Sequence, residues 1–554
     1  MAKLSYFHRG GDAPLEWATI PGHVRAIAAR FPDYEAIVSR HQNRRLSYAD
    51  LMRQTDALAK GLLASGFQKG ERIGVWATDN VEWLLVQLAT ARLGVILVNI
   101  NPAYRPRELE YALKTSQVQG LFVMPRFKSS DYLGMLKELE LPGPRCPDLR
   151  SVFVFDPLGE TDDWRALLQA GEGVTDADLD SVTASLDPDD PINIQYTSGT
   201  TGFPKAVLLT HFNILNNALF SARAMHFTEH DRLCVPVPFY HCFGMVLANL
   251  LCLSVGATIV LPAEHFDALA VLETIEAERC TALHGVPTMF IADLEHADFA
   301  TFDLTSLRTG IMAGATCPEA LMKRVMTDMH CPEILIGYGQ TEASPLTHLT
   351  DAHDTMDLRT QTVGRNLPHQ EVKIVAPESG ATLPLGSVGE VCFRGYHIMR
   401  GYFGDAEATA KAIDEAGWLH SGDLGTMDEN GYVRITGRIK DMIIRGGENI
   451  YPAEIEEWLF LHPAIAQAAV FGVPDEKMGE EIMAWIEPHA GARLSADEVK
   501  AYCREGLAHF KVPRHVEFVT EFPMTVTGKL QKFKMREIAA KTLEAASAAG
   551  PGGA

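Results

Sequence analysis

The sequence lacks the features that mark several large classes of protein. Its 554 residues contain no Cys-x-x-Cys pair, and the nine cysteines are dispersed along the chain. With 47% hydrophobic and 22% charged residues, the composition is that of a globular protein and excludes disorder, collagen and coiled coil as the main character. Dispersed thiols without a secretory signal predict reduced cysteines and a cytoplasmic location.

Positive charge and long apolar runs are also scarce. The chain has 49 Lys and Arg against 71 Asp and Glu, a formal net charge of −22, which argues against a nucleic-acid partner. The longest apolar run, residues 245–261, is interrupted by Asn249, Ser254 and Gly256, so it predicts a helix followed by a strand and no transmembrane segment.

The best-known nucleotide and hydrolase motifs are missing as well. Neither Gly202, which precedes Phe-Pro-Lys, nor Gly528, which precedes Lys529 and Leu530, completes a Walker A loop. His-Glu-x-x-His, Gly-x-Ser-x-Gly and a strand-linked Gly-x-Gly-x-x-Gly do not occur. Zincin, α/β-hydrolase and simple dinucleotide-binding functions therefore lose their usual support.

What is present is the pattern of an α/β fold. In the first 100 residues, and again over 206–262 and 271–336, continuous apolar runs alternate with helical segments. A capping box at Ser47–Asp50 predicts a helix that ends near Gly66. Because continuous apolar strands separated by helices are typical of sheets buried on both faces, we expect mostly parallel sheets with flanking helices.

The pattern changes twice toward the C-terminus. Short apolar runs separated by Gly, Pro and Asp predict a β-rich subdomain at about 370–436, within an N-terminal domain of residues 1–437. A basic stretch at 437–445 then leads into a smaller α+β domain, 438–554, with a boundary and hinge at 438–441. Its predicted elements are helices at 452–461 and 495–508 and strands at 466–472, 481–487 and 515–519.

Two segments carry groups suited to phosphate chemistry. In the first, hydroxyls and backbone N–H groups between two strand-like stretches could cradle phosphate oxygens, with Lys205 supplying positive charge; a polar hairpin loop is the alternative. Its candidate residues are Thr197, Ser198, Gly199, Thr200, Thr201 and Gly202. In the second, an apolar strand ends in residues that could stack on a base, bond a phosphate and help hold Mg²⁺; an ordinary strand-end turn is the alternative. Its candidate residues are Gly337, Tyr338, Gly339, Gln340, Thr341 and Glu342.

Three further segments acquire meaning only in combination. Asp423 could accept hydrogen bonds from a ribose diol, although a lone Asp there is more often a turn cap. Arg438 and Lys440 begin a stretch that suits a hinge or a solvated linker. Lys529, taken alone, would be a surface lysine.

Taken together and in this order, the five segments resemble the adenylate-forming superfamily of acyl-CoA synthetases, firefly luciferases and peptide-synthetase adenylation domains. The resemblance extends from about residue 30 to residue 540. The runs 396–403, 440–455 and 509–513 are most similar to those of medium-chain fatty acyl-CoA synthetases. The resemblance implies a large N-terminal domain and a small, mobile C-terminal domain.

The resemblance also implies a role for each candidate residue. The loop 197–205 would wrap the ATP phosphates, Tyr338 would stack on adenine, and Glu342 and Thr341 would serve Mg²⁺ and phosphate. Lys529 would bridge the carboxylate and the α-phosphate, which makes Lys529, Thr341, Glu342 and Lys205 the implied catalytic set. The remaining implied positions are Gly314, Ala315 and Thr316 at adenine, Asp423 and Arg438 at the ribose, Lys440 at the hinge, Gly446 and Gly447 beside the thiol channel, and His241, Val286 and Ala313 at the acyl pocket.

The implied activity is that of an ATP-dependent fatty acid:CoA ligase with ATP, Mg²⁺ and CoA as its cofactors and co-substrates. An enzyme that loads an acyl-carrier protein, a ligase for long-chain or other acids, and a non-catalytic acyl-nucleotide sensor are the alternatives; the filled first-step positions argue against the sensor. The chain departs from the family at one position. Some relatives carry a lysine that assists the second half-reaction where this chain has Ile444, followed by Arg445. Whether Arg445 takes that role is left open. A homodimer is left open.

Overall fold

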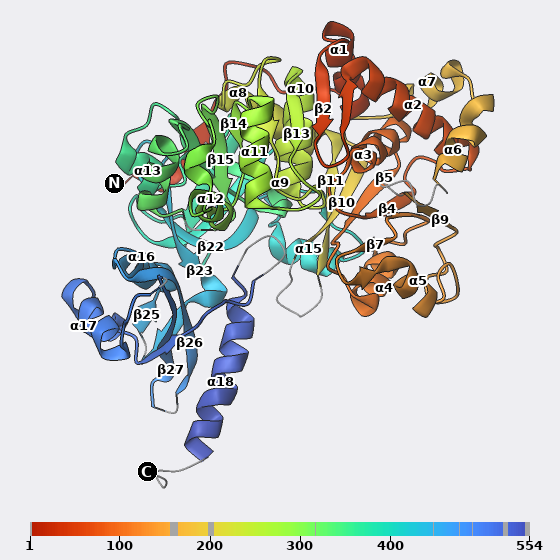
Figure 1. The fold of residues 1–554 in the computed structure, drawn as a ribbon. Helices are drawn as coiled ribbons and strands as arrows, with labels where there is room; N and C mark the ends of the chain where they lie inside the picture. The colour runs from red at the N-terminus through yellow and green to blue at the C-terminus, as the bar shows by residue number, and fades with distance from the viewer. Residues whose placement is uncertain are drawn as a thin grey trace. The chain divides into compact units, whose positions relative to one another are not determined.

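A computed structural model describes residues 3–155, 164–197, 204–315, 317–446, 448–475, 477–489, 491–524 and 530–548 (Figure 1). The chain divides into two compact units. The larger unit comprises Phe7–Val372 and Phe393–His420, and the smaller unit comprises Met1–Tyr6, Lys373–Cys392 and Ser421–Ala554. The expected boundary and hinge at 438–441 stay a prediction.

Two sheets form the core of the larger unit. The seven-stranded sheet has the order β21 (Gly401–Tyr402), β11 (Lys205–Thr210), β10 (Pro191–Thr197), β5 (Ile96–Ile100), β4 (Arg72–Trp76), β6 (Gly120–Val123) and β9 (Ser151–Val154). The nine-stranded sheet has the order β18 (Arg365–Asn366), β17 (Leu346–Leu349), β16 (Glu333–Gly339), β15 (Thr309–Ala313), β14 (Ala282–Leu283), β12 (Arg232–Cys234), β13 (Thr258–Leu261), β2 (Glu35–Ser39) and β3 (Arg44–Ser47).

The interior strand pairs of both sheets are parallel, which confirms the expected α/β fold. In the first sheet β10, β5, β4, β6 and β9 run parallel, and in the second the strands from β16 through β2 do. Antiparallel pairs occur toward the sheet ends, at β10–β11–β21, β16–β17–β18 and β2–β3. The carboxyl ends of neighbouring parallel strands therefore gather chemically active residues at shared sheet edges.

Local signals in the sequence explain the helices around these sheets. Helix α2 (Tyr48–Ala64) begins at the predicted capping box, where Ser47 and Asp50 exchange hydrogen bonds, and ends just before Gly66. Helix α3 (Val81–Leu93) is capped by Asn80, and every one of its residues is buried. A helix with no polar face has to lie inside the protein, which explains the unbroken apolar pattern of this region.

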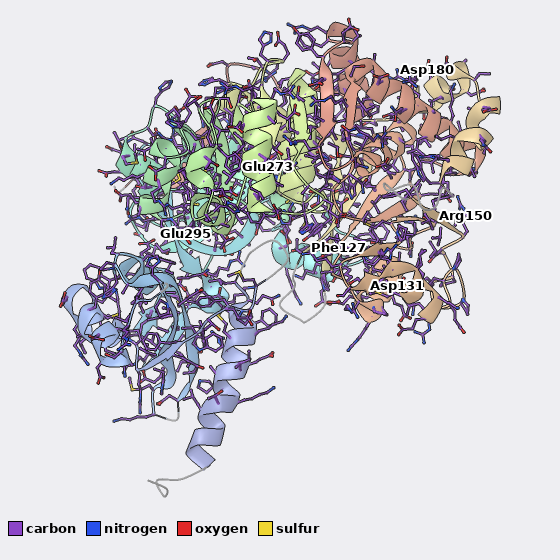
Figure 2. The ribbon with its side chains drawn as sticks, viewed as in Figure 1. Phe127, Asp131, Arg150, Asp180, Glu273 and Glu295 are labelled. Carbon is purple, nitrogen blue, oxygen red and sulfur yellow. The ribbon has the colours of Figure 1, made fainter. Side chains whose placement is uncertain are left out.

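A second apolar cluster joins one set of helices to the nine-stranded sheet. Buried side chains of α11 (Ala268–Glu278), α12 (Pro287–Leu294) and α13 (Glu319–Thr327) pack with those of β12, β14, β15 and β16. These helices lie beside β14 and β15 in Figure 1. Figure 2 places Asp180, Glu273 and Glu295 at the surface of the larger unit, where such exposed acidic side chains carry the net negative charge.

The longest apolar run forms a helix followed by a strand, as predicted. It begins with a π-helix, η2 (Met245–Leu250), continues through α10 (Leu251–Val255), and turns at Gly256 into β13. Among the described residues, no helix combines the length and apolar character needed to cross a bilayer. All nine cysteines are buried, and none of them forms a disulfide.

The segment from about 370 to 436 is largely a sheet, as expected. Four of its strands join β1 (Tyr6–Arg9) in one sheet, in the order β1, β19 (Gln370–Val375), β20 (Gly389–Gly395), β22 (Leu419–Met427) and β23 (Val433–Arg438). The division between the two units runs through four of these five strands. One short helix, α15 (Ala406–Ala412), interrupts the segment.

The C-terminal part of the smaller unit is a sheet covered on both faces. Strands β25 (Glu448–Ile450), β24 (Ile443–Arg445), β27 (Gly479–Pro488) and β26 (Ile465–Asp475) are neighbours in that order, and β28 (His515–Phe518) pairs with β27. Alternate residues of β26 and β27 pack against α16 (Pro452–Phe460) and α17 (Ala496–Gly506), and the others against α18 (Lys532–Ala548). Figure 1 shows α16 and α17 on one side of this sheet and α18 on the other. Four of the five predicted elements are confirmed within two residues; the fifth, the predicted strand 466–472, extends to Ile465–Asp475.

Candidate active site

A hairpin brings the two ends of the predicted phosphate loop together. Thr197 is the last residue of β10, Lys205 is the first residue of β11, and the two are directly paired across the strands. Both side chains are half-buried. The loop residues Ser198, Gly199, Thr200, Thr201 and Gly202 lie outside the described residues, so their predicted contacts with phosphate stay predictions.

The second phosphate segment is a tight turn at the carboxyl end of β16. A Cβ atom on Gly339 would lie 1.9 Å from the carbonyl oxygen of Pro345, so only glycine fits at this close approach. The chain then forms a short 3₁₀ helix, Thr341–Ala343, and Ser344 follows in the left-handed region at φ 70°. Such backbone conformations are uncommon outside glycine and concentrate at functional sites.

These two segments meet at the carboxylate of Glu342. The Thr197 hydroxyl donates to Oε1 of Glu342 at 3.3 Å, and the Tyr402 hydroxyl donates to the same oxygen at 3.0 Å. The Lys205 ammonium lies 4.6 Å from the centre of the Tyr402 ring. Three of the predicted residues are thus joined, together with a fourth residue from β21.

Tyr402 is the residue that sequence reasoning missed. Its strand pairs with β11, which places its ring beside Lys205. Burial raises the pKa of the Tyr402 hydroxyl, and the charge of Glu342 raises it further, so the hydroxyl stays protonated and remains a donor. The run 396–403, which contains Tyr402, is part of the resemblance and is the signal that could have found this residue. The resemblance implies no role for Tyr402 itself.

The predicted adenine residues lie at neighbouring strand ends. Strands β15 and β16 are parallel, and Ala313 pairs directly with Gly337. Gly314 and Ala315 follow β15 and are exposed, close in register to the half-buried Tyr338 and Gln340. The Tyr338 ring packs near His348 and Phe393, with centroid distances of 6.0 and 6.1 Å. Thr316 lies outside the described residues.

In the smaller unit, Asp423 and Arg438 form a cross-strand ion pair. The two residues are paired between β22 and β23, and Arg438 Nε lies 3.0 Å from Asp423 Oδ1. The Asp423 side chain is 7% exposed and the Arg438 side chain is 54% exposed. A buried acceptor beside an accessible guanidinium suits a diol or an anion. Lys440 is exposed, in the 3₁₀ turn that follows.

The predicted acyl-pocket residues lie beside the phosphate turn. Nδ1 of His241 accepts the backbone N–H of Phe243 at 3.1 Å, which caps the short helix α9 (Cys242–Gly244). The neighbouring Cys242 Sγ lies 3.5 Å from Oγ1 of Thr341. Val286 is buried and directly precedes α12 (Pro287–Leu294). Gly285, the residue before Val286, accepts the backbone N–H of Ala313 through its carbonyl at 3.2 Å.

Arg445, whose role the sequence left open, is committed to an ion pair. It donates through Nε and Nη2 to the two carboxylate oxygens of Glu481, at 2.7 and 3.0 Å. Burial acts to raise the pKa of Glu481, but the guanidinium groups of Arg445 and Arg514 outweigh it and hold that pKa below its usual range. The neighbouring Ile444 is 51% exposed.

Of the predicted residues that remain, the structure describes Gly446. It is exposed in the turn between β24 and β25 at φ 60°, and its N–H donates to the Met478 carbonyl at 2.8 Å. Gly447 and Lys529 lie outside the described residues, so their roles at the thiol channel and the α-phosphate stay predictions.

Comparison with known proteins places the whole chain in one group. Residues 24–403 match the model of AMP-binding enzymes, and residues 454–529 match that of the AMP-binding enzyme C-terminal domain. YngI of Bacillus subtilis (strain 168), whose name assigns it to the acyl-CoA synthetases, is 49% identical over 96% of this chain and 98% of its own. The mitochondrial medium-chain acyl-CoA ligase ACSF2 of Danio rerio is 43% identical over 97% of this chain and 91% of its own.

A solved structure agrees with these sequence matches. The crystal structure of the anthranilate CoA ligase AuaEII in complex with anthranoyl-AMP superposes with a TM-score of 0.86 at 26% identity. The superposition covers 96% of this chain and 99% of that one. The fold expected from the resemblance is therefore confirmed.

Proposed function

As a member of the AMP-binding enzyme family, the chain is an ATP-dependent acid:CoA ligase, and we propose that its acid is a medium-chain fatty acid. The full-length similarity to a medium-chain acyl-CoA ligase carries this proposal. Apolar residues at the proposed acyl pocket support it, since Val286 and Ala313 suit an alkyl chain better than a charged group. Each buried CH₂ contributes about 0.8 kcal/mol, so such a pocket would discriminate acids by length.

The reaction has two balanced steps. A carboxylate oxygen attacks the α-phosphorus of ATP, which forms an acyl-adenylate and releases pyrophosphate. The thiolate of CoA then attacks the acyl carbonyl, and AMP leaves with the pair of electrons of the broken C–O bond. Both reactants of the first step are anions, so the protein has to bring them together and offset their repulsion.

We assign that task to the Glu342 cluster and its neighbours. Lys205 and the donors of loop 197–202 would hold the phosphates, and Tyr338 with residues 313–315 would face the base. Asp423 and Arg438 would hold the ribose. Lys529 would bridge the carboxylate and the α-phosphate, and a rotation at Lys440 would exchange it for Gly446 and Gly447 before thioester formation.

Magnesium fits the donors at this cluster. Mg²⁺ prefers oxygen ligands and is commonly bound by one or two carboxylates together with substrate phosphates and water. Glu342 would hold the ion, since its carboxylate is half-buried and oriented by two hydroxyl groups. When bound, the ion would supply positive charge to the phosphates.

The proposal is tested by measuring CoA-thioester formation by mass spectrometry, with ATP and Mg²⁺, for straight-chain acids from acetate to palmitate. Product centred on middle lengths supports a medium-chain pocket, whereas a maximum at acetate or palmitate contradicts it. If an acyl-AMP forms and no acid yields a CoA thioester, the alternative of loading an acyl-carrier protein replaces the proposal. The nine buried thiols fit the cytoplasmic location proposed from the sequence.

A further inference from the structure

A buried carboxylate outside the proposed site holds the loop that carries His241. Asp79 lies between β4 and α3 and is 3% exposed. Its Oδ1 accepts the backbone N–H of Phe239 at 2.7 Å. The adjacent Asn80 already caps α3 by accepting the N–H of Trp83 at 2.7 Å, so the helix does not need Asp79.

A second buried side chain binds the backbone of the next residue of the same loop. Asn99, on β5, is 2% exposed, and its Nδ2 donates to the carbonyl of Tyr240 at 3.1 Å. Its Oδ1 accepts from Nδ2 of Asn193 at 2.9 Å, which fixes the orientation of the amide. The segment after β4 supplies an acceptor and the neighbouring parallel strand β5 supplies a donor, to two successive residues of the loop.

The loop itself has little room to move. The N–H of His241 donates to the carbonyl of Pro238 at 3.1 Å, which closes a turn. A Cβ atom on Gly244 would lie 2.2 Å from that carbonyl oxygen, so the end of α9 packs directly on the turn. The ring of Phe239 packs against Trp83 of α3, with a centroid distance of 5.5 Å.

Burying polar side chains in this way is costly unless it serves a purpose. A buried carboxyl or amide lowers stability when its partners are lost, and two apolar residues of the same shape can be equally stable. The Asp79 oxygen accepts the Phe239 N–H whether the carboxyl is protonated or ionised. The gain is directional, because these bonds determine where the loop backbone lies.

We propose that Asp79 and Asn99 are positioning residues that set the enzyme's selectivity for its acid by fixing the loop 238–241. They would not touch the acid. They would hold the backbone on either side of Tyr240, and with it His241 at the acyl pocket and Cys242 beside Thr341. This inference rests on the placement of His241 in the proposed function.

The test compares Asp79→Ala with Asp79→Asn, and includes Asn99→Ala, on β5, as an independent variant. We expect Asp79→Ala to raise the KM for the best acid by about tenfold and to broaden the chain-length profile, with the KM for ATP changed less than about twofold. Asp79→Asn should restore both properties, because an amide oxygen can accept the same N–H. Asn99→Ala should repeat the effect of Asp79→Ala.

Asp293→Ala is the matched control, since Asp293 is also a buried aspartate of the larger unit, 1% exposed, on α12. An equal loss for ATP and acid, no rescue by Asp79→Asn, or an unchanged chain-length profile in folded Asp79→Ala would overturn the proposal. If Asp79→Ala does not fold, folded Asn99→Ala decides by the same criteria. A wild-type enzyme that makes no thioester refutes the proposed function itself, before any variant is compared.

Discussion

The Tyr402 hydroxyl donates to Oε1 of Glu342 across a separation of 60 residues, at 3.0 Å. The same oxygen accepts from Thr197, whose position in the chain is 145 residues away from that of Glu342. Three distant segments thus converge on one carboxylate oxygen. These two hydrogen bonds fix the orientation of the half-buried Glu342 carboxylate.

Tyr402→Phe removes one of these two donors and leaves the ring in place. We expect the apparent affinity for Mg²⁺ and ATP to fall about tenfold, with a loss of stability of about 1.5–3 kcal/mol, because a hydrogen bond to a charged group contributes about that much. Magnesium titration of pyrophosphate release checks this. Tyr34→Phe is the control, since Tyr34 is 40% exposed. A Tyr402→Phe enzyme with an unchanged magnesium response would refute the assigned role.

Gly339→Ala should disrupt the turn that presents Thr341 and Glu342. Its Cβ would lie 1.9 Å from a backbone oxygen, and overpacking of this kind costs about 1–3 kcal/mol or more. We expect a lower melting temperature and a large loss of adenylation. Gly173→Ala is matched, because a Cβ there meets nothing within 4 Å. Equal behaviour of the two variants would contradict the structure of the turn.

Arg445→Ala should destabilise the smaller unit without stopping adenylation. It leaves Glu481, only 1% exposed, without its bidentate partner, and breaking a buried ion pair costs about 3–5 kcal/mol. Denaturant unfolding measures the loss, and acyl-AMP formation measures the first step. Lys3→Ala is the control in the same unit, because the Lys3–Glu429 pair is exposed on both sides. A stable but adenylation-dead Arg445→Ala would assign Arg445 to the chemistry after all.

Acid should weaken the larger unit through its buried histidines. Burial lowers the pKa of His284 to about 4, and that of His211, His348 and His397 to about 3, from 6.5. The unfolded chain therefore binds more protons between pH 6.5 and these lower values, so stability falls as the pH drops. At pH 5.5 each such histidine removes about 1.4 kcal/mol.

Melting temperatures from pH 7.5 to pH 5 check this expectation, and the slope is the informative quantity. His284 makes the clearest single test, because its Nδ1 accepts the N–H of Ile311 at 3.1 Å and its Nε2 contacts the Leu247 carbonyl at 2.9 Å. That arrangement requires the neutral ring. His284→Gln should flatten the acid slope while lowering stability at neutral pH; an unchanged slope would mean that His284 does not titrate as expected.

Lys529→Ala should separate the two half-reactions. If Lys529 bridges the carboxylate and the α-phosphate, its loss removes positive charge needed in the first step only. We expect acyl-AMP formation to fall by more than about 100-fold, while thioester formation from supplied acyl-AMP persists. Lys541→Ala, on α18, is the control. Equal losses in both half-reactions would refute the assignment.

The sequence predicted most of what depends on neighbours in the chain. The capping box at Ser47, the alternation of buried strands and helices, and the C-terminal α+β pattern all reflect periodicity that local residues create. The resemblance implies that Thr197, Lys205 and Glu342 share one site, and in the structure Thr197 donates to Glu342 and pairs across the hairpin with Lys205. Their roles in catalysis stay predictions.

What the sequence could not show depends on long-range packing. Tyr402 lies in a two-residue strand, and only its pairing with β11 brings it to Glu342 and Lys205. Nothing in the sequence links Asp79 to the Phe239 backbone 160 positions later, so the sequence predicts no role for this carboxylate. The sequence leaves the role of Arg445 open, because nothing in it shows that Glu481, 36 positions later, binds the guanidinium.

The nine buried thiols offer a way to follow the two units separately in the unmodified protein. Cys392 and Cys503 belong to the smaller unit and the other seven to the larger one. A buried thiol reacts with an alkylating reagent only when its surroundings open, so the alkylation rate of each cysteine reports the opening of one local region. Pulsed labelling followed by peptide mass analysis would therefore record the order in which the regions open. The same experiment with ATP would show which cysteines are alkylated more slowly when ATP is present and which are unaffected.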